Sequence, residues 1–414
     1  MSACSADPVA SGDDLLEPST VPAAEEPEPT TIAPTLESAA PDGTLAGRIA
    51  VGGNAGLQLL EPSGEPAAVV SSGAVAVSQP TWSRSGDRVV ATIAAGGAGF
   101  QTLVVADTGD DSVSTPVRRP YFFYSWSTDG SYIAALGPGL IGTSLDILDA
   151  DGVPVSDVAL DSGSLYLAWE PGGDDLLVHT DEELFLVTDI TDLGSLSPLG
   201  SPGEQFLAPA WIPDTRDALI VVQEVDGARL VRIEVDSGRQ TDLGPIDGAA
   251  GIVVSADGTK ALLAHSDAVS GGPTFASFVE VSPVADVTAP TELIDLGTGE
   301  RTVISSSQSI WAEWSPDGSA IVLLQPSESG LEWSVWSEGT LKGLGAFLPS
   351  PTFLQNYLLF GWQYVETPRV WSPDGQAITY AAIDNGQVGI YVHRLTDASP
   401  VRIADGDVAF WSPG

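Results

Sequence analysis

A tryptophan-centred phrase repeats along most of the chain and limits the folds that the chain can adopt. Its clearest copies read WSPDG followed by an apolar run, at Trp314 and Trp371. Val254 takes the place of the tryptophan in one further copy. The tryptophans that mark the remaining copies are Trp82, Trp126, Trp169, Trp211 and Trp411. Successive markers stand 44, 43, 42, 43, 60, 57 and 40 residues apart, so one supersecondary unit is repeated about every 42 residues.

The residues within one repeat predict a four-stranded unit. In the SPDG segment, Pro suits the second position of a tight turn and Gly suits its left-handed position, so the segment closes a hairpin. The apolar run that follows, such as AIVLLQ from Ala320, suits a strand that is buried on both faces. The tryptophan is large enough to fill the gap between neighbouring units. Four short strands at this period are typical of a β-propeller, so we expect an all-β fold of four-stranded blades.

The two ends of the repeat region predict how such a ring closes. AFWSPG at the C-terminus supplies a first strand with nothing after it, whereas the segment from Gly47 to Ser72 reads as strands two to four without a first. The two fragments complete one blade if the N-terminal and C-terminal strands pair. Counting this composite gives eight blades. Seven is the alternative if the Val254 unit and its long insertion are wrongly divided.

The repeat resembles the WD-like propeller repeat of the TolB type, whose mark is W-S-P-D-G before a hydrophobic strand. The resemblance covers about Gly47 to Gly414 and is strongest at Trp314, Trp371 and Trp411. It implies a β-propeller and a role in protein–protein contacts at the cell envelope. Since propellers host binding proteins and several enzyme classes, the repeat indicates the fold and leaves the function open.

The charge of the chain excludes several classes of partner. Its 414 residues carry 56 acidic and 15 basic side chains, a formal net charge of −41. With only two lysines the chain can neutralise few phosphates, so we expect neither nucleic acid nor an anionic membrane surface as a partner. Hydrophobic residues make up 43% of the chain, which is enough to bury a large core.

The N-terminal residues 1–45 have the composition of a disordered acidic tether, and the propeller is expected to occupy 46–414. From Ser5 to Thr44 there is no Lys or Arg, and prolines recur in phrases such as EEPEPTTIAPT. Cys4 follows the small residues Ser2 and Ala3, as at the end of a bacterial lipoprotein signal, although a charged segment and an apolar segment are missing before it. We predict that Cys4 is lipidated and anchors an extracytoplasmic protein, either periplasmic or on the outer face of the cytoplasmic membrane.

The sequence contains no recognisable catalytic or metal-binding motif. G-x-S-x-G, which a hydrolase domain attached to such a propeller would carry, does not occur. Cys4 is the single cysteine, so thiolate metal clusters within the chain are excluded. The histidines lie far apart, and we interpret His179, His265 and His393 as ordinary strand-end residues. We therefore expect no metal and no cofactor. Paired carboxylates for glycoside chemistry stay open, because 56 acids offer many pairs.

Two aromatic-rich stretches are the candidates for a partner-binding surface. Both precede a repeat marker, so both are expected on the propeller face that carries the loops entering the first strands. The first stretch supplies Arg118, Arg119, Tyr121 and Phe123. The second supplies Phe353, Tyr357, Phe360, Trp362 and Tyr364. A surplus of rings near arginines, on a chain poor in arginine, is typical of an interaction patch, although some of these rings must face the core.

The leading functional hypothesis is a non-enzymatic, envelope-associated propeller, monomeric and lipid-anchored, that binds a protein or an envelope polymer. The alternative is an envelope hydrolase or lyase that acts on a carbohydrate or lactone at the mouth of the propeller channel. An isolated pair of acids with raised pKa in the channel would favour the enzyme. Exposed rings on one face would favour the binding protein.

Overall fold

The computed structural model describes residues 45–70, 75–95, 101–109, 112–115, 117–140, 142–192, 194–200, 202, 207–246, 249–266, 290–358 and 368–414. The chain divides into two units, Met1–Thr35 and Leu36–Gly414, and every described residue belongs to the second. Within these residues no helix is both long and apolar enough to cross a membrane. The predicted tether and Cys4 lie outside them.

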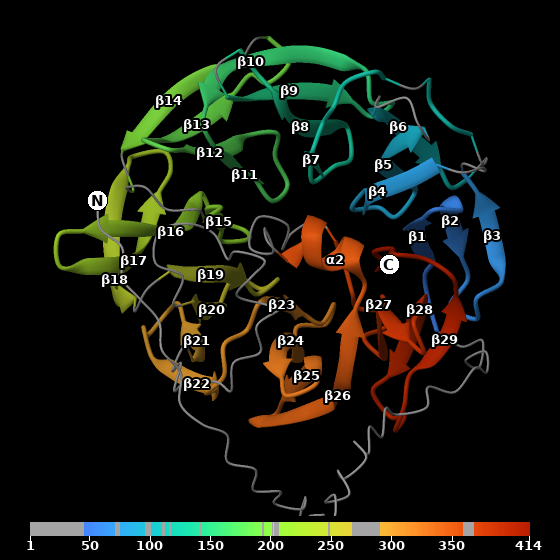
Figure 1. The fold of residues 1–414 in the computed structure, drawn as a ribbon. Coiled ribbons are helices and arrows are strands. Elements are labelled where there is room, and N and C mark those ends of the chain that lie inside the picture. The colour runs from blue at the N-terminus through green and yellow to red at the C-terminus, as the bar shows by residue number, and fades with distance from the viewer. Residues whose placement is uncertain are drawn as a thin grey trace, which may run out of the picture. The chain divides into compact units, whose positions relative to one another are not determined.

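Antiparallel sheets make up nearly all of the described structure and follow one another around a common centre (Figure 1). The sheet that contains both chain ends has the order β3-β2-β1-β30 and consists of β1 (Ile49–Gly53), β2 (Gly56–Leu60), β3 (Pro66–Val69) and β30 (Val408–Trp411). A three-stranded sheet follows, with β4 (Val75–Trp82), β5 (Arg88–Ala95) and β6 (Gln101–Asp107). Isolated bridges at Val113 and Val117 extend it beyond β6.

Four four-stranded sheets come next along the chain, and in each of them the strands neighbour one another in sequence order. The first consists of β7 (Phe123–Trp126), β8 (Tyr132–Pro138), β9 (Thr143–Asp149) and β10 (Pro154–Ser162). The second consists of β11 (Leu165–Trp169), β12 (Leu176–Thr180), β13 (Leu184–Thr188) and β14 (Ser195–Gly200). The third consists of β15 (Ala210–Trp211), β16 (Asp217–Glu224), β17 (Gly227–Glu234) and β18 (Arg239–Ile246). The fourth consists of β19 (Ala249–Val254), β20 (Lys260–Ser266), β21 (Thr291–Asp295) and β22 (Arg301–Ser305).

The last strands form a seven-stranded sheet, with the short helix α2 (Pro351–Asn356) in the connection between its two parts. The first part consists of β23 (Trp311–Trp314), β24 (Ala320–Ser327), β25 (Gly330–Ser337) and β26 (Thr340–Pro349). The second part consists of β27 (Ala377–Asp384), β28 (Gln387–Arg394) and β29 (Val401–Ala404). The parts are joined by two residue pairs between β26 and β27, and Trp371 forms a bridge to Ile378 on β27.

Side-chain and backbone hydrogen bonds stabilise the turn that follows the repeat tryptophan. In the turn after β23, the amide of Ser315 donates to the carbonyl of Ala320 (2.8 Å), and the Ser315 hydroxyl donates to Asp317 (2.7 Å) and accepts from the amide of Ala320 (2.9 Å). Gly318 has a φ of 70°. This left-handed conformation is unfavourable for any residue that has a Cβ atom, so the turn favours glycine here. Ser372 and Asp374 repeat the same arrangement before β27. The Ser, Asp and Gly of the S-P-D-G segment therefore each have a local structural role.

The repeat tryptophans tie neighbouring sheets together. The indole N–H of Trp126 donates to the carbonyl of Thr81 (3.1 Å), the residue before Trp82. The same bond, from one marker to the residue before the preceding marker, recurs from Trp169 to Ser125, from Trp211 to Ala168, from Trp314 to Val253, from Trp371 to Glu313 and from Trp82 to Phe410. Trp411 instead donates to the carbonyl of Ala46 (2.9 Å). These rings are buried or partly buried, so each fills the space between two sheets and also satisfies an inner-strand carbonyl.

The two ends of the described chain pair directly. β1 and β30 are antiparallel neighbours, with Ile49 opposite Trp411 and Gly52 opposite Val408. The amide of Ser412 donates to the carbonyl of Arg48 (2.8 Å), next to this pairing. β1 and β30 therefore belong to one antiparallel sheet.

Candidate binding face

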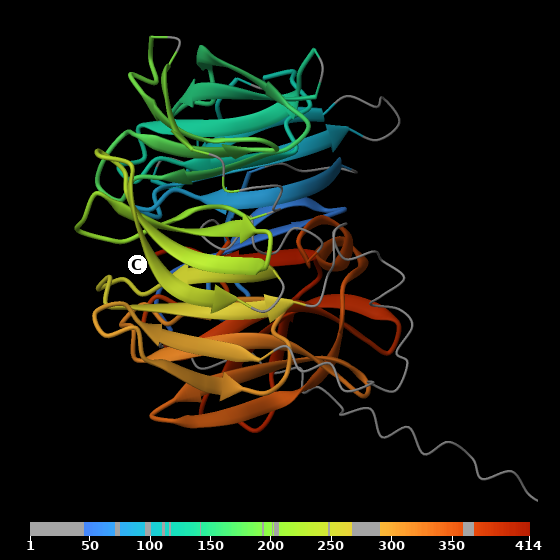
Figure 2. The same ribbon diagram turned by 90° about the vertical axis from the view of Figure 1, so that its left-hand side faces the viewer.

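The direction of the strands gives the second unit two distinct ends. The segments that enter the first strands and the loops between second and third strands lie at one end, which we call the loop face. Residues 118–122, 139–140 and 225–226 belong to it. The turns after the repeat markers lie at the other end, which we call the turn face. The C-terminus lies on the turn face, as the side view shows (Figure 2).

The segment before β7 is fixed to the sheet by one buried acid. Asp146 on β9 is 2% exposed. It accepts a hydrogen bond from the hydroxyl of Tyr121 (2.6 Å) and forms an ion pair with Arg119. Burial raises the pKa of Tyr121 to about 12, so the phenol stays protonated and keeps donating. The carbonyl of Phe122 accepts from the side-chain amide of Gln79 (2.6 Å) on the preceding sheet. The segment therefore has a fixed conformation.

Only part of this predicted patch reaches the surface. Arg118 and Phe122 are exposed, and the side chain of Arg119 is about half exposed although it pairs with Asp146. Tyr121 and Phe123 are 2% and 5% exposed and belong to the hydrophobic core. The prediction that these two rings contact a partner is therefore wrong, because both rings pack into the hydrophobic core. The sequence did not single out Phe122, which alternation turns outward.

The helix α2 buries two rings of the second predicted patch, Phe353 and Tyr357. Ser350 caps this helix by accepting from the amide of Phe353 (3.1 Å), and Pro351 occupies the first turn. Phe353 and Tyr357 are 6% and 1% exposed, so neither is available to a partner. Phe353 contacts Trp311 on β23, and Tyr357 contacts Phe410 on β30, with ring centroids 6.0 and 5.0 Å apart. The remaining rings of this patch, Phe360, Trp362 and Tyr364, lie outside the described residues.

The two most exposed of the large apolar side chains in the described residues lie on the loop face. Leu140 lies between β8 and β9 and is 97% exposed, and Val225 lies between β16 and β17 and is fully exposed. Leu348, near the end of β26, and Phe122 are about half exposed. The sequence reasoning missed Leu140 and Val225; an apolar residue in the tip of a short hairpin loop was the available signal.

One inner strand, β23, carries a buried acid with a raised pKa. Glu313 on β23 is 7% exposed, and one of its carboxylate oxygens accepts from the amide of Val370 (2.9 Å). Its other oxygen is buried without a hydrogen-bond partner in the described part of the chain. Burial raises the pKa of Glu313 to about 7, although the guanidinium of Arg369 and the Val370 amide act to lower it. Arg369 is the charged group among the main causes of this shift in the described residues.

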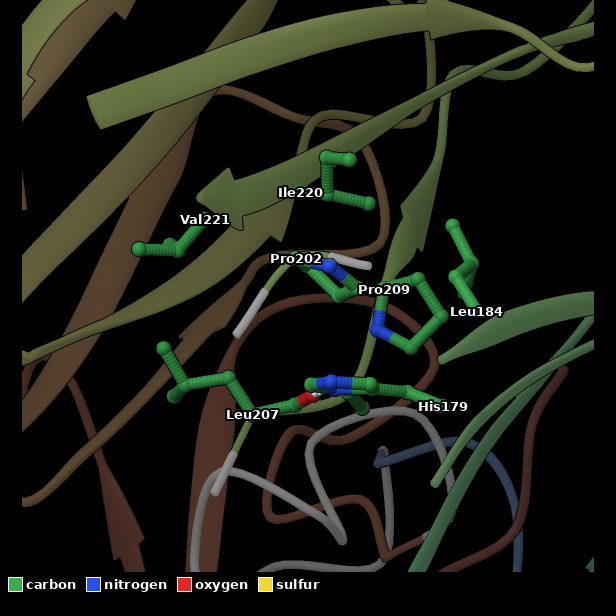
Figure 3. Close-up of a pocket in the computed structure, with 8 residues that line it drawn as sticks. His179, Leu184, Pro202, Leu207, Pro209, Ile220 and Val221 are labelled. Carbon is green, nitrogen blue, oxygen red and sulfur yellow. Dashed lines mark hydrogen bonds between the residues drawn. The ribbon is translucent and has the colours of Figure 1, made fainter. Parts of the chain in front are cut away.

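Two small cavities lie among the described residues. One lies between β12 and β16 and is lined by His179, Leu207 and Ile220, with the ring of Pro209 beside them (Figure 3). Its volume of about 10 Å³ has room for one water. A second cavity, of about 30 Å³, lies on the turn face among Trp82, Trp126 and Trp169.

The three histidines are buried in separate strands. The Nδ1 of His179 lies 3.0 Å from the carbonyl of Leu207, and the Nε2 of His265 lies 3.1 Å from Glu292. His393 lies on β28, where burial lowers its pKa. No group of three or more His, Cys, Asp or Glu side chains in the described ranges could hold a metal ion.

Comparisons with known proteins identify the fold. A eukaryotic initiation factor has a similar structure, with a TM-score of 0.58 and 14% identity over 89% of this chain and 98% of that one. The β-propeller domain of the trilobed protease from Pyrococcus furiosus follows, with a TM-score of 0.50 and 14% identity over 80% and 98%. This chain is a β-propeller.

The likeness extends to TolB from Acinetobacter baumannii, with a TM-score of 0.40 and 17% identity over 76% of this chain and 79% of TolB. No protein-family model matches the chain, and no curated protein matches it either. Identities this low show the propeller fold alone, so the function has to be argued from the residues of this propeller.

Proposed function

We propose that this chain is a non-enzymatic propeller of the cell envelope that binds a protein or polymer partner through its loop face. The observation that carries the proposal is the segment before β7. It exposes Arg118 and Phe122, while Asp146 binds the side chains of Arg119 and Tyr121. A surface that is ordered before binding loses less conformational entropy on binding than a mobile one. Arginine and aromatic side chains are also the types that contribute most to binding energy.

The proposed propeller has eight blades and is closed by its chain ends. The described sheets divide into eight groups if the seven-stranded sheet is read as two blades and β30 completes the first blade. The chain of indole hydrogen bonds supports this reading, because Trp82 reaches back to Phe410 across the chain ends. Ile49, Trp411 and residues of β27 and β28 share one hydrophobic cluster, which joins the first and last blades.

The degree of exposure of single apolar side chains supports the loop face. The two most exposed large hydrophobic residues, Leu140 and Val225, lie there. On a protein with a net charge of −41, apolar and cationic groups on one face reduce the cost of desolvating that face.

The alternative, a hydrolase or lyase acting on a carbohydrate or lactone, has weaker support. Such an enzyme needs two cooperating carboxyl groups. Glu313 has the raised pKa of a general acid, but the charged group acting on it is Arg369. The described cavities, of about 10 and 30 Å³, are also far smaller than the roughly 300 Å³ of a small-molecule site.

The proposed location is extracytoplasmic, with a lipid on Cys4 as the membrane anchor and residues 1–45 as the tether. The composition of the tether supports it, and the acidic surface supports a protein or polymer partner rather than a nucleic acid. We propose a monomeric protein.

The test is capture of the partner from crosslinked intact cells by loop-face variants. Arg118→Glu combined with Leu140→Ser should reduce recovery of the crosslinked partner at least about tenfold, because it removes exposed groups and no core contact. The matched control is Val155→Ser, which changes an exposed apolar residue on β10. Equal recovery by the wild type, the double variant and the control would refute the loop face as the binding surface.

A further inference from the structure

Glu313 occupies a position of the repeat that is otherwise neutral. It stands directly before the marker Trp314, on the inner strand β23. At the other seven markers this position holds Thr, Ser, Ala, Val or Phe. The backbone at this position binds an indole of the next sheet, and here Trp371 donates to the carbonyl of Glu313 (3.2 Å). Glu313 therefore places an ionisable group between two sheets at a point where the other copies of the repeat have none.

The carboxyl group of Glu313 binds a segment of the neighbouring sheet. One carboxylate oxygen accepts from the amide of Val370 (2.9 Å), 57 residues further along the chain. Val370 belongs to residues 368–371, which we call the inner segment. It lies where an inner strand is expected before β27, but its pairing with β27 is one isolated bridge, between Trp371 and Ile378. The inner strands β7, β11 and β23 each have four or five paired residues, so the inner segment depends more on contacts with neighbouring sheets.

The inner segment is also bonded to β27 and to β30. The carbonyl of Val370 accepts from the amide of Thr379 on β27 (2.8 Å). The carbonyl of Arg369 accepts from the amide of Trp411 on β30 (2.7 Å). Together with the Glu313 bond, these contacts join three sheets through a few residues. The amides of Val370, Thr379 and Trp411 therefore each report whether the inner segment is in place.

A negative charge on Glu313 has one cation to compensate it in the elements around β23. The side chain of Glu313 is 7% exposed. β24 pairs with β23, β19 packs against it and α2 contacts it through Trp311, and these three elements contain no ionisable side chain. From the inner segment, the guanidinium of Arg369 acts to lower the pKa of Glu313, but burial outweighs it and raises this pKa to about 7. The carboxyl is therefore neutral in mildly acidic solution and ionised above neutral pH.

We propose that Glu313 is a pH-sensitive latch, which keeps the inner segment in place while its carboxyl is neutral and releases the segment when the carboxyl ionises. A neutral carboxyl needs no counter-ion and still accepts from the Val370 amide through its carbonyl oxygen. An ionised carboxylate gains solvation free energy when the segment moves aside and water enters. Release also separates Arg369 from Trp411, so it loosens the junction between the last sheet and β30.

The test is hydrogen exchange of the full chain, measured by mass spectrometry with fragmentation at pH 6 and pH 8. Exchange is expressed as protection factors, which correct for the pH dependence of the intrinsic rate. In the wild type we expect the protection of the Val370, Thr379 and Trp411 amides to fall about tenfold from pH 6 to pH 8. This is the ratio for a carboxyl whose pKa is about 7 in the closed segment and 4.5 in the open one. The amides of β7 and β8, which have no acid at the position of Glu313, are the control and should not change.

Two variants separate the latch from a general effect of pH. Glu313→Gln keeps an acceptor for the Val370 amide and cannot ionise, so its protection factors should be equal at both pH values. Arg369→Gln removes the cation that favours ionisation in the closed segment, so the fall should be larger than in the wild type.

The proposal is overturned by a wild type without the fall, by a fall of equal size in Glu313→Gln, or by the same fall in β7 and β8. If Glu313→Gln does not fold, the comparison of the wild type with Arg369→Gln still decides, because a smaller fall in that variant contradicts a release driven by burial of charge. The measurement needs no binding partner, so failure here is distinct from failure of the proposed function.

Discussion

Glu313 is a residue at which folding and protonation are coupled in the range between acidic and neutral pH. Its carboxyl is buried with one oxygen bonded to the Val370 amide and the other without a hydrogen-bond partner in the described residues. The folded-state pKa of about 7 lies above the ordinary value of 4.5, so the folded protein holds this proton more tightly than the unfolded chain does. The ionised carboxylate therefore destabilises the fold, and stability falls as pH rises from about 4.5 to 7.

We expect Glu313→Gln to remove this pH-dependent penalty. The difference of 7 − 4.5 corresponds to up to about 3 kcal/mol, so the variant should be more stable than the wild type at pH 8 and should lose most of that advantage near pH 5. Urea unfolding at both pH values measures the change, with the exposed Glu300→Gln as control. A variant less stable than the wild type at pH 8 would mean that the ionised carboxylate is a net stabilising group.

At the residue scale, the roles of the turn residues could be predicted from the sequence, whereas the roles of the buried acids could not. Ser315, Asp317 and Gly318 bond within a few residues of one another, so their roles follow from local turn chemistry. Asp146 acts on Arg119 and Tyr121 from 27 and 25 residues away, and this contact depends on how the segment folds over the sheet. Nothing in the sequence distinguishes such an acid from the other 55.

At the scale of elements, α2 shows why the predicted aromatic patch was only partly correct. Ser350 followed by Pro351 is a typical helix start, so the position of α2 could be predicted from the sequence. The direction of Phe353 and Tyr357 was not, because it depends on packing against Trp311 and Phe410 from other strands. The all-β class and the four-stranded sheets, in contrast, followed from the period of the repeat and are confirmed.

We expect Phe353→Ala to lower the free energy of unfolding by about 3 to 5 kcal/mol, because it removes a buried ring from the contact with Trp311. Gln355→Ala, on the exposed side of the same helix, is the matched control and should cost little. Denaturant unfolding monitored by tryptophan fluorescence gives both values. Equal stability of the two variants would show that α2 is not packed as described.

At the scale of the whole molecule, stability should depend on the pairing of the chain ends. Deleting residues 408–414 removes β30 and leaves the edge of β1 without its partner. We expect a large loss of the melting temperature, approaching global unfolding, whereas deletion of Met1–Thr35 should leave it unchanged. Calorimetry of both truncated chains is the measurement, and a C-terminally truncated chain that melts like the wild type would contradict the closed ring.

The anchoring proposal concerns the molecule in its cell. Protein produced from its natural gene should partition into the detergent phase if Cys4 carries lipid, since acyl chains contribute about 0.8 kcal/mol per buried methylene group. Cys4→Ala should move to the aqueous phase. Identical partitioning of the two forms would exclude a lipid on Cys4.

The most direct test of the binding function is site-specific photocrosslinking in intact cells. A photoreactive residue replaces Phe122 on the loop face in one variant and Val153, in the turn between β9 and β10, in another. The two native side chains are 45% and 47% exposed, so the positions are equally accessible to solvent. We expect a discrete crosslinked partner from position 122 and none from position 153. Crosslinking of the same partner from position 153 alone, or no adduct from position 122, would contradict a loop face that binds.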